Sequence, residues 1–223
     1  MELFMNTWAN YNENGADGGI TPTGWMSLDE AEEYCEKYAE YEPFINDAEG
    51  CPFEINEYSN PEEVIEQLRS VENYTDTEQE VLSAMMDDGY DFDDAVRIID
   101  IGDFIYRDGD MSDFIYDYVD DIGGVSELGE DTLERYFDYE QLGRDLSFDS
   151  YEDADGEEMS AGEYWCGDEG ASDYDIGLAF VEAVGIDGVS NAENYFDYDA
   201  FARDVEMEGH FLETESGIVE ILD

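Results

Sequence analysis

The net charge is the property that most restricts how this chain can fold. Of its 223 residues, 64 are Asp or Glu and only 7 are Lys or Arg, so the formal charge at pH 7 is −57. Two such charges about 7 Å apart in water repel by roughly 0.6 kcal/mol, and this self-repulsion disfavours a compact sphere. We therefore expect an α+β fold arranged as an elongated string of small domains, because that shape spreads the charge over more surface.

The apolar content predicts that the chain folds despite its charge. Hydrophobic residues make up 42% of the sequence and aromatic residues 14%, which is more than disordered acidic chains carry. We expect no direct binding to nucleic acid or to anionic lipid, since phosphate contacts need Lys and Arg. No run of 18 apolar residues predicts a membrane span, and the first ten residues lack the basic flank of a secretory signal.

The cysteines indicate a reducing compartment. Cys35, Cys51 and Cys166 are an odd number, widely spaced, and form no CxxC pair. This usage is typical of free thiols in a cytosol-like environment.

Prolines and hydrophobic periodicity predict four domains. All four prolines lie in the first 61 residues, which places a boundary near residues 60–75. We predict an N-terminal α/β domain at residues 1–62 and a helical middle domain at 63–102. Two tandem C-terminal α/β units are predicted at 103–150 and 151–223.

Local signals locate several elements within these domains. Ser27 and Glu30 have the spacing of a capping box, and Asn60 with Pro61 has the pattern of a cap followed by proline at the first helical position. Both patterns predict helix starts. Strands are predicted at residues 2–9 and 52–58, and two helices separated by Gly89 at 77–101. Residues 149–173 are expected to form a hairpin plus a loop, and residues 210–222 a strand, a turn and a strand.

An internal repeat occupies the C-terminal half. The block YFDYEQLGRDL at 136–146 recurs as YFDYDAFARDV at 195–205, and each copy follows a GVS triplet and an amphipathic helix. A tandem duplication explains this pattern better than chance.

Within the repeat, matching residues are assigned matching structural roles. Asp138 and Asp197 are predicted N-caps, and Tyr139 and Tyr198 are predicted core residues. The two matching arginines, Arg144 and Arg203, are expected to pair with nearby carboxylates as structural counter-ions.

The sequence offers no residue set for catalysis. His210 is the only histidine, and the motifs GxSxG, GxGxxG and GxxxxGK[ST] are absent. Close carboxylate pairs carry no information among 64 acids, and no EF-hand loop is complete. We therefore predict that the protein is not an enzyme, with no catalytic residue, no metal site and no cofactor.

The charge density itself suggests a function. B-DNA carries about one negative charge per 1.7 Å of axis, so 57 charges correspond to roughly 97 Å, or about 28 base pairs. Carboxylates held on helix faces could stand where phosphates stand and compete for a protein with a basic DNA channel. A solvated acidic surface of the halophilic kind is the alternative interpretation. The candidate partner-binding carboxylates are Asp29, Glu32, Glu33, Glu36, Glu62, Glu63, Glu66, Asp87, Asp88, Asp113, Asp117, Asp120, Asp121, Glu130 and Asp131.

Several segments carry a family resemblance. The opening Trp8-Ala-Asn-Tyr-Asn12, the pair Gly24-Trp25 and PFEINEYSNPEEV at 52–64 resemble ArdA-type anti-restriction proteins. So do FIYRDGDMSDFIYDYVDDIGG at 104–124 and the first YFDY block, the most specific piece. The resemblance covers roughly residues 2–150, and residues 174–220 look like a second, shortened copy of the family's C-terminal unit.

The resemblance implies a DNA mimic encoded by phages, plasmids or transposons and acting in the bacterial cytoplasm. Such a protein occupies the DNA-binding groove of type I restriction–modification enzymes without chemistry, and the family assembles as a homodimer. One alternative is a polyanionic inhibitor of another nucleic-acid-binding defence system, such as a CRISPR effector or another nuclease. The other is an acidic chaperone of basic DNA-binding proteins.

Overall fold

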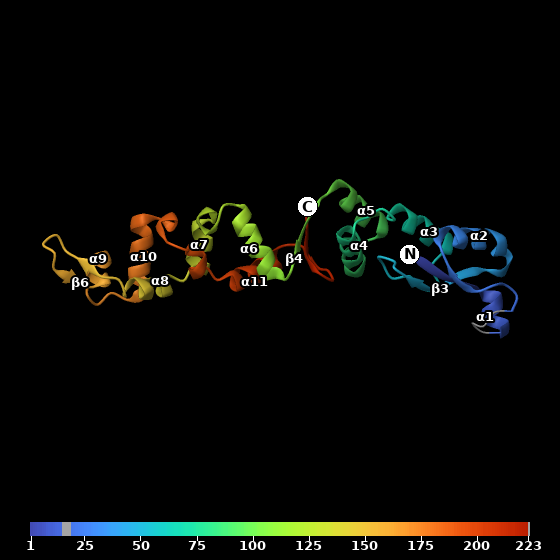
Figure 1. The fold of residues 1–223 in the computed structure, drawn as a ribbon, viewed down its shortest axis with the longest axis horizontal. Helices are drawn as coiled ribbons and strands as arrows, with labels where there is room; N and C mark the ends of the chain where they lie inside the picture. Colours follow the sequence, from blue (N-terminus) through green and yellow to red (C-terminus); the bar gives the residue numbers. More distant parts are fainter. Residues whose placement is uncertain (15–18, 223) are drawn as a thin grey trace. The chain divides into compact units, whose positions relative to one another are not determined.

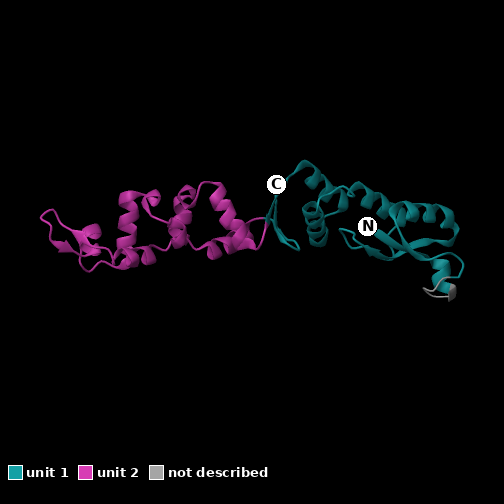
Figure 2. Cartoon of the chain, in the orientation of Figure 1, with its two compact units in different colours: residues 1–107, 210–223 teal, residues 108–209 magenta. Residues whose placement is uncertain are grey.

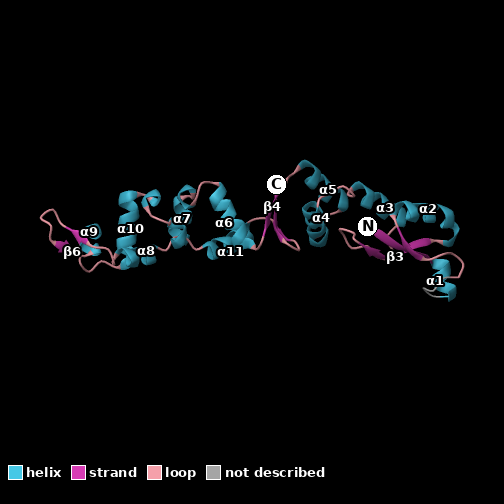
Figure 3. Cartoon of the chain, in the orientation of Figure 1, coloured by secondary structure: helices cyan, strands magenta, loops and turns pink. Residues whose placement is uncertain are grey.

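The chain divides into two compact units (Figure 2). The computed structural model describes residues 1–14 and 19–222. Unit 1 comprises residues 1–107 and 210–223, and unit 2 comprises residues 108–209, so unit 2 is inserted between two segments of unit 1. Helices occur together with three small separate sheets, which confirms the predicted α+β class (Figure 3).

Unit 1 begins with a three-stranded antiparallel sheet in the order β2-β1-β3. The strands are β1 (Glu2–Thr7), β2 (Gly24–Met26) and β3 (Pro43–Glu49), and α1 (Trp8–Asn14) directly follows β1 (Figure 1). Helix α2 (Leu28–Tyr38) packs on this sheet and runs into the short 3-10 helix η2 (Ala39–Tyr41). Ser27 and Glu30 form the predicted capping box at the start of α2.

The predicted strand at residues 52–58 is wrong. The segment is a turn, in which the Asn56 side chain accepts a hydrogen bond from Tyr58 N at 2.9 Å and the Asn56 carbonyl accepts one from Ser59 N at 3.0 Å. Asn favours this local hydrogen bonding over a strand ladder. The third strand of the sheet is instead β3, which the sequence patterns did not reveal.

Three helices and a second sheet complete unit 1. Helices α3 (Pro61–Ser70), α4 (Asp76–Asp88) and α5 (Phe92–Ile101) begin at side-chain caps, including the predicted cap at Asn60, and Gly89 ends α4 in the left-handed conformation. The second sheet has the order β4-β8-β7, with β4 (Phe104–Asp108), β7 (Phe211–Glu213) and β8 (Gly217–Ile221). The predicted C-terminal strand–turn–strand is confirmed, and its buried residues join the core formed by α4.

Unit 2 is mainly helical. Its first part contains α6 (Met111–Asp121), η3 (Val125–Glu127), α7 (Glu130–Tyr136) and α8 (Tyr139–Leu146). A hairpin of β5 (Tyr151–Glu152) and β6 (Glu158–Met159) follows as predicted, but α9 (Ala161–Cys166) replaces the expected loop because Ser160 caps a helix there. The second part contains α10 (Asp173–Val184), η4 (Ile186–Gly188), η5 (Ala192–Tyr195) and α11 (Tyr198–Glu208).

The two copies of the repeat pair with each other. The carbonyl of Tyr136 accepts a hydrogen bond from Asp197 N at 2.9 Å, and the carbonyl of Tyr195 accepts the matching bond from Asp138 N at 2.7 Å. The side chains repeat this reciprocity, because Tyr195 donates to Asp145 at 3.0 Å and Tyr136 donates to Asp204. Asp138 and Asp197 are N-caps, as predicted.

The helices around this pairing are exchanged between the copies. Helix α8 packs on α10, and α11 packs on α6, so the helix after each YFDY block packs on the helix before the other block. At the α8–α10 crossing, Gly143 and Gly177 allow backbone-to-backbone contact. The matching position in α11 is Ala202, which is also buried. Unit 2 therefore contains an approximate internal twofold relation between the copies.

Candidate functional site

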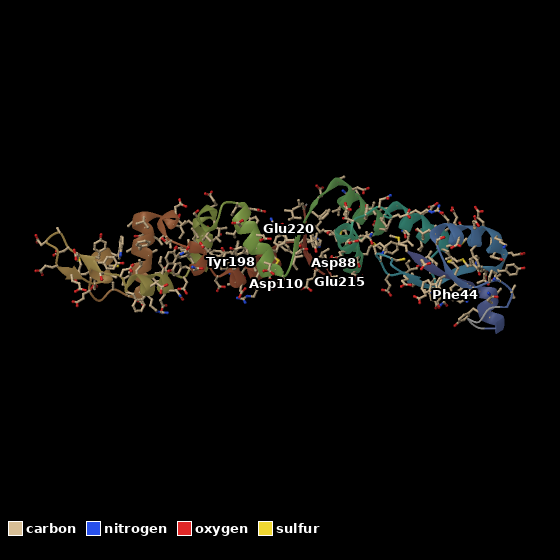
Figure 4. The ribbon with its side chains drawn as sticks, in the orientation of Figure 1. Phe44, Asp88, Asp110, Tyr198, Glu215 and Glu220 are labelled. Carbon is tan, nitrogen blue, oxygen red and sulfur yellow. The ribbon has the colours of Figure 1, made fainter. Side chains whose placement is uncertain are left out.

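All fifteen candidate carboxylates are exposed. They lie on five helices whose opposite faces are buried: four on α2, three on α3, two on α4, four on α6 and two on α7. Figure 4 shows many carboxylate oxygens at the outer ends of side chains on both units. Amphipathic packing thus fixes where these charges stand, because each helix can bury only one of its faces.

Helix geometry gives these charges a regular spacing. The four candidate carboxylates of α2 span residues 29–36, a rise of about 10.5 Å, or one candidate charge per about 3.5 Å. Those of α6 span residues 113–121, or one charge per about 4 Å. Successive phosphates of one DNA strand advance by about 3.4 Å along the axis. Helices α2 and α6 therefore carry their candidate charges at an average linear density close to that of one DNA strand.

Helices α2 and α3 together form an acidic groove in unit 1. Its lining consists of Glu32, Cys35, Glu36, Glu62, Ile65 and Glu66. Burial, followed by the charges of Glu62 and Glu32, raises the pKa of the Cys35 thiol to about 11. The thiol is therefore protonated at neutral pH, and the groove offers carboxylates rather than a nucleophile.

Some predicted carboxylates already have partners within unit 1. Arg69 Nη2 lies 2.7 Å from Asp29 Oδ1 and 2.7 Å from Glu32 Oε2, which ties α3 to α2. His210 Nε2 lies 3.4 Å from Asp88 Oδ2. Asp29 and Glu32 therefore present less net charge than Glu33 and the other unpaired members of α2.

One predicted carboxylate of unit 2 has a structural role. Asp113 accepts a hydrogen bond from Asp110 N at 3.2 Å and completes the capping box of α6. The repeat arginines differ from each other, although the sequence assigned them one role. Arg144 Nη2 pairs with Glu140 at 3.0 Å and its Nε lies 3.7 Å from Asp173, whereas the described residues give Arg203 no ion pair.

Sequence reasoning missed a second acidic depression in unit 1. It lies between α4 and the β7–β8 turn, and its carboxylates are Asp76, Glu80, Asp87, Glu213 and Glu215. The last two are far from α4 in sequence, so no local pattern could have joined them to it.

Glu80 has a structural role in this depression. Its Oε2 accepts hydrogen bonds from Ser216 Oγ at 2.6 Å, Thr214 Oγ1 at 3.0 Å and Ser216 N at 3.2 Å. These bonds lower the pKa of Glu80, with the Ser216 hydroxyl as the largest cause. Through these hydrogen bonds, Glu80 of α4 stabilises the β7–β8 hairpin against the helix.

Residues 1–14 and 19–222 offer neither a clustered metal site nor a membrane-spanning helix. No group of three or more His, Cys, Asp or Glu side chains there is arranged to hold a metal ion. In the same residues, no helix has both the length and the apolar character required to cross a bilayer.

Comparison with known proteins identifies the family. A search of curated proteins found no match. The family model described as "Antirestriction protein (ArdA)" matches residues 3–157, which is more than half of the chain. The match covers residues 3–107 of unit 1 and the first copy of the repeat in unit 2, and it stops before the second copy. The chain therefore belongs to the ArdA family of antirestriction proteins.

Proposed function

We propose that this antirestriction protein occupies the DNA-binding groove of a type I restriction–modification enzyme, with its exposed carboxylates in place of DNA phosphates. The observation that carries the proposal is the exposure of all fifteen candidate carboxylates, with those of α2 and α6 spaced on average at about the phosphate repeat. The net charge of −57 supplies the long-range attraction to a basic groove.

The binding energy in this proposal comes mainly from displaced counterions. A protein that contacts six to ten DNA phosphates loses about 10³- to 10⁵-fold in affinity between 50 and 200 mM salt. A carboxylate array that uses the same basic residues should show a similarly steep dependence. Because many contacts share the energy, a single carboxylate should matter little.

Competition against DNA tests the proposal. A purified type I enzyme is loaded with a fluorescent duplex that contains its recognition sequence, and this protein is titrated in at several salt concentrations. We expect complete displacement of the duplex and a steep loss of affinity with salt. A ternary complex with the duplex still bound, or an affinity that is flat between 50 and 300 mM salt, contradicts the proposal.

Charge-removal variants then locate the array. The variant Glu33→Gln, Glu36→Gln, Glu62→Gln and Glu66→Gln removes four predicted contacts of α2 and α3. Each lost contact should reduce the slope of log affinity against log salt by about one. The matched control removes the same charge from exposed positions outside the predicted set, as Glu152→Gln, Glu157→Gln, Glu158→Gln and Glu169→Gln. Equal losses in both variants would show that only net charge matters.

The same reagents separate the alternative partners. Inhibition of a CRISPR effector or another nuclease, without inhibition of the type I enzyme, would support DNA mimicry that is directed at a different target. Equal affinity for many unrelated basic proteins would instead support the acidic chaperone.

A further inference from the structure

A cluster of aromatic rings on the surface of unit 1 has no role in the proposed carboxylate array. Trp8 stacks on the buried ring of Phe44, with ring centroids 4.3 Å apart, and on the ring of Tyr58, with centroids 6.1 Å apart. Tyr11 packs edge-on against Trp8 and Phe44. The outer rings are open to solvent, since Tyr58 is 80% exposed and Tyr11 49% exposed. We call these four residues the aromatic platform.

A buried polar network fixes the helix that carries two of these rings. Asn10 is fully buried in α1, and its Nδ2 donates to Thr21 Oγ1 at 2.7 Å and to the Thr21 carbonyl at 2.9 Å. Its Oδ1 accepts from Ile20 N at 2.8 Å and from Thr21 N at 3.1 Å. Trp8 N donates to the Glu42 carbonyl at 3.0 Å. Trp8 and Tyr11 are therefore held in place before any partner arrives.

A turn fixes the position of the most exposed ring of the platform, that of Tyr58. The Asn56 side chain accepts from Tyr58 N at 2.9 Å, which holds Tyr58 beside Trp8 immediately before α3. Glu57, the residue immediately before Tyr58, brings a carboxylate next to this ring, and its hydrogen bonding and its charge raise the pKa of the Tyr58 phenol. The platform thus combines an open π-face with an adjacent negative charge.

Unit 2 contains an example of a guanidinium group that contacts a tyrosine ring and a carboxylate together. Arg135 Cζ lies 5.2 Å from the ring centroid of Tyr136, and Arg135 Nη2 lies 2.6 Å from Asp204 Oδ2. One guanidinium there uses a ring face and a carboxylate together. Such contacts are favourable because the π-face is negative and guanidinium is planar and weakly hydrated.

We propose that the aromatic platform binds an arginine side chain of the target protein, stacked on Tyr58 and paired with Glu57. The partner's chemistry rests on the proposed function, since a basic DNA-binding surface exposes arginines. A DNA phosphate offers no counterpart to this contact, so the platform would give affinity and selectivity that the carboxylate array lacks. Its stacking component would resist salt better than the array does, because stacking does not depend on released counterions.

A small probe tests the platform without the restriction enzyme. Acetyl-Gly-Arg-Gly-amide is titrated into the whole protein, with acetyl-Gly-Lys-Gly-amide at matched ionic strength as the control for general attraction to the acidic surface. The indole N–H signal of Trp8, assigned with Trp8→Phe, is followed by NMR. We expect a larger shift with the arginine peptide, and its loss in Tyr58→Ala. Equal shifts with both peptides, or an unchanged arginine shift in Tyr58→Ala, would overturn the proposal.

Binding to the target tests the platform in its proposed role. Tyr58→Ala should weaken binding to the enzyme by about 2- to 10-fold at 200 mM salt, whereas Tyr58→Phe keeps the ring and should stay within about 2-fold. Phe148→Ala, at an 83% exposed ring of unit 2, is the matched control and should have no effect. If Tyr58→Ala binds the enzyme with unchanged affinity, the proposal for the aromatic platform is refuted and the proposed carboxylate array is unaffected. If Trp8 responds to the arginine peptide but the protein does not displace the duplex from the enzyme, the proposed array is refuted and the proposal for the platform is unaffected.

Discussion

Replacing Gly143 by Ala should open the crossing of α8 and α10. A Cβ at this position would come closest to the carbonyl oxygen of Asp173, and would lie 2.6 Å from the carbonyl carbon of Asp173 and 2.9 Å from the backbone nitrogen of Gly177, where ordinary contact begins at 3.4 Å. All three obstacles are backbone atoms, so no side chain can rotate away, and the helices must separate by more than an ångström. Such overpacking costs about 1–3 kcal/mol, and at a backbone contact we expect the upper end of that range. The higher helix propensity of Ala offsets up to about 1 kcal/mol of this cost.

The expected net loss in the free energy of unfolding of unit 2 is about 2 kcal/mol. A loss of 1 kcal/mol lowers the Tm of a domain of about 100 residues by roughly 4–8 °C, so unit 2 should melt about 8–16 °C lower. Hydrogen exchange read by mass spectrometry should show lost protection in residues 139–146 and 173–184, with protection of unit 1 unchanged.

The second copy of the repeat supplies the control for this experiment. Ala202 occupies the matching position in α11 and tolerates its methyl group at the looser α6–α11 crossing. Ala202→Gly should cost about 1 kcal/mol through helix propensity and about 0.8 kcal/mol more for the lost buried methyl group. An unchanged Tm in Gly143→Ala, or unchanged exchange protection of residues 139–146 and 173–184 in that variant, would refute the close-crossing argument.

Three further outcomes follow from groups in unit 1. Glu80 has a lowered pKa in the folded state, so its contribution is present above the ordinary carboxyl pKa of 4.5 and is lost as the pH falls through the folded value. Exchange protection of β7–β8 should fall with acid in that window, and Glu80→Gln should weaken the hairpin at pH 7 and flatten this dependence. Cys35 should react with iodoacetamide at pH 8 far more slowly than the exposed Cys166, as read by peptide mass spectrometry, because it is buried and its pKa is about 11; equal rates would contradict its burial. Asn10→Ala removes the acceptor of the buried Thr21 N and the part-buried Ile20 N and should destabilise unit 1 by about 2–4 kcal/mol in urea unfolding, whereas a cost below 1 kcal/mol would contradict the network.

The elements that could be predicted are those specified by a few neighbouring residues. Ser27, Asn60, Asp138 and Asp197 cap their helices as expected, because a cap is a bond between a side chain and a backbone N–H two or three residues away. The exposure of the carboxylates followed from helical periodicity for the same reason. Whether they form one binding array stays a prediction.

The features that could not be predicted depend on distant parts of the chain. Strand β3 is specified by its pairing with β1, and the turn at Asn56 overrode a strand-like composition. The bond from Arg69 to Asp29 joins residues 40 positions apart. The repeat was visible in the sequence, but no local pattern indicated that its two copies exchange helices. The four predicted domains likewise remain a prediction beside the two compact units.

The insertion of unit 2 affects how the chain is made. Strands β7 and β8 leave the ribosome about 100 residues after β4, their partner in the second sheet. At 5–20 residues per second this is a delay of roughly 5–20 s, during which the core around α4 lacks Leu212 and Val219. A nascent chain cut short before residue 210 would never close this sheet, so unit 1 is finished only after the whole of unit 2 has been synthesised.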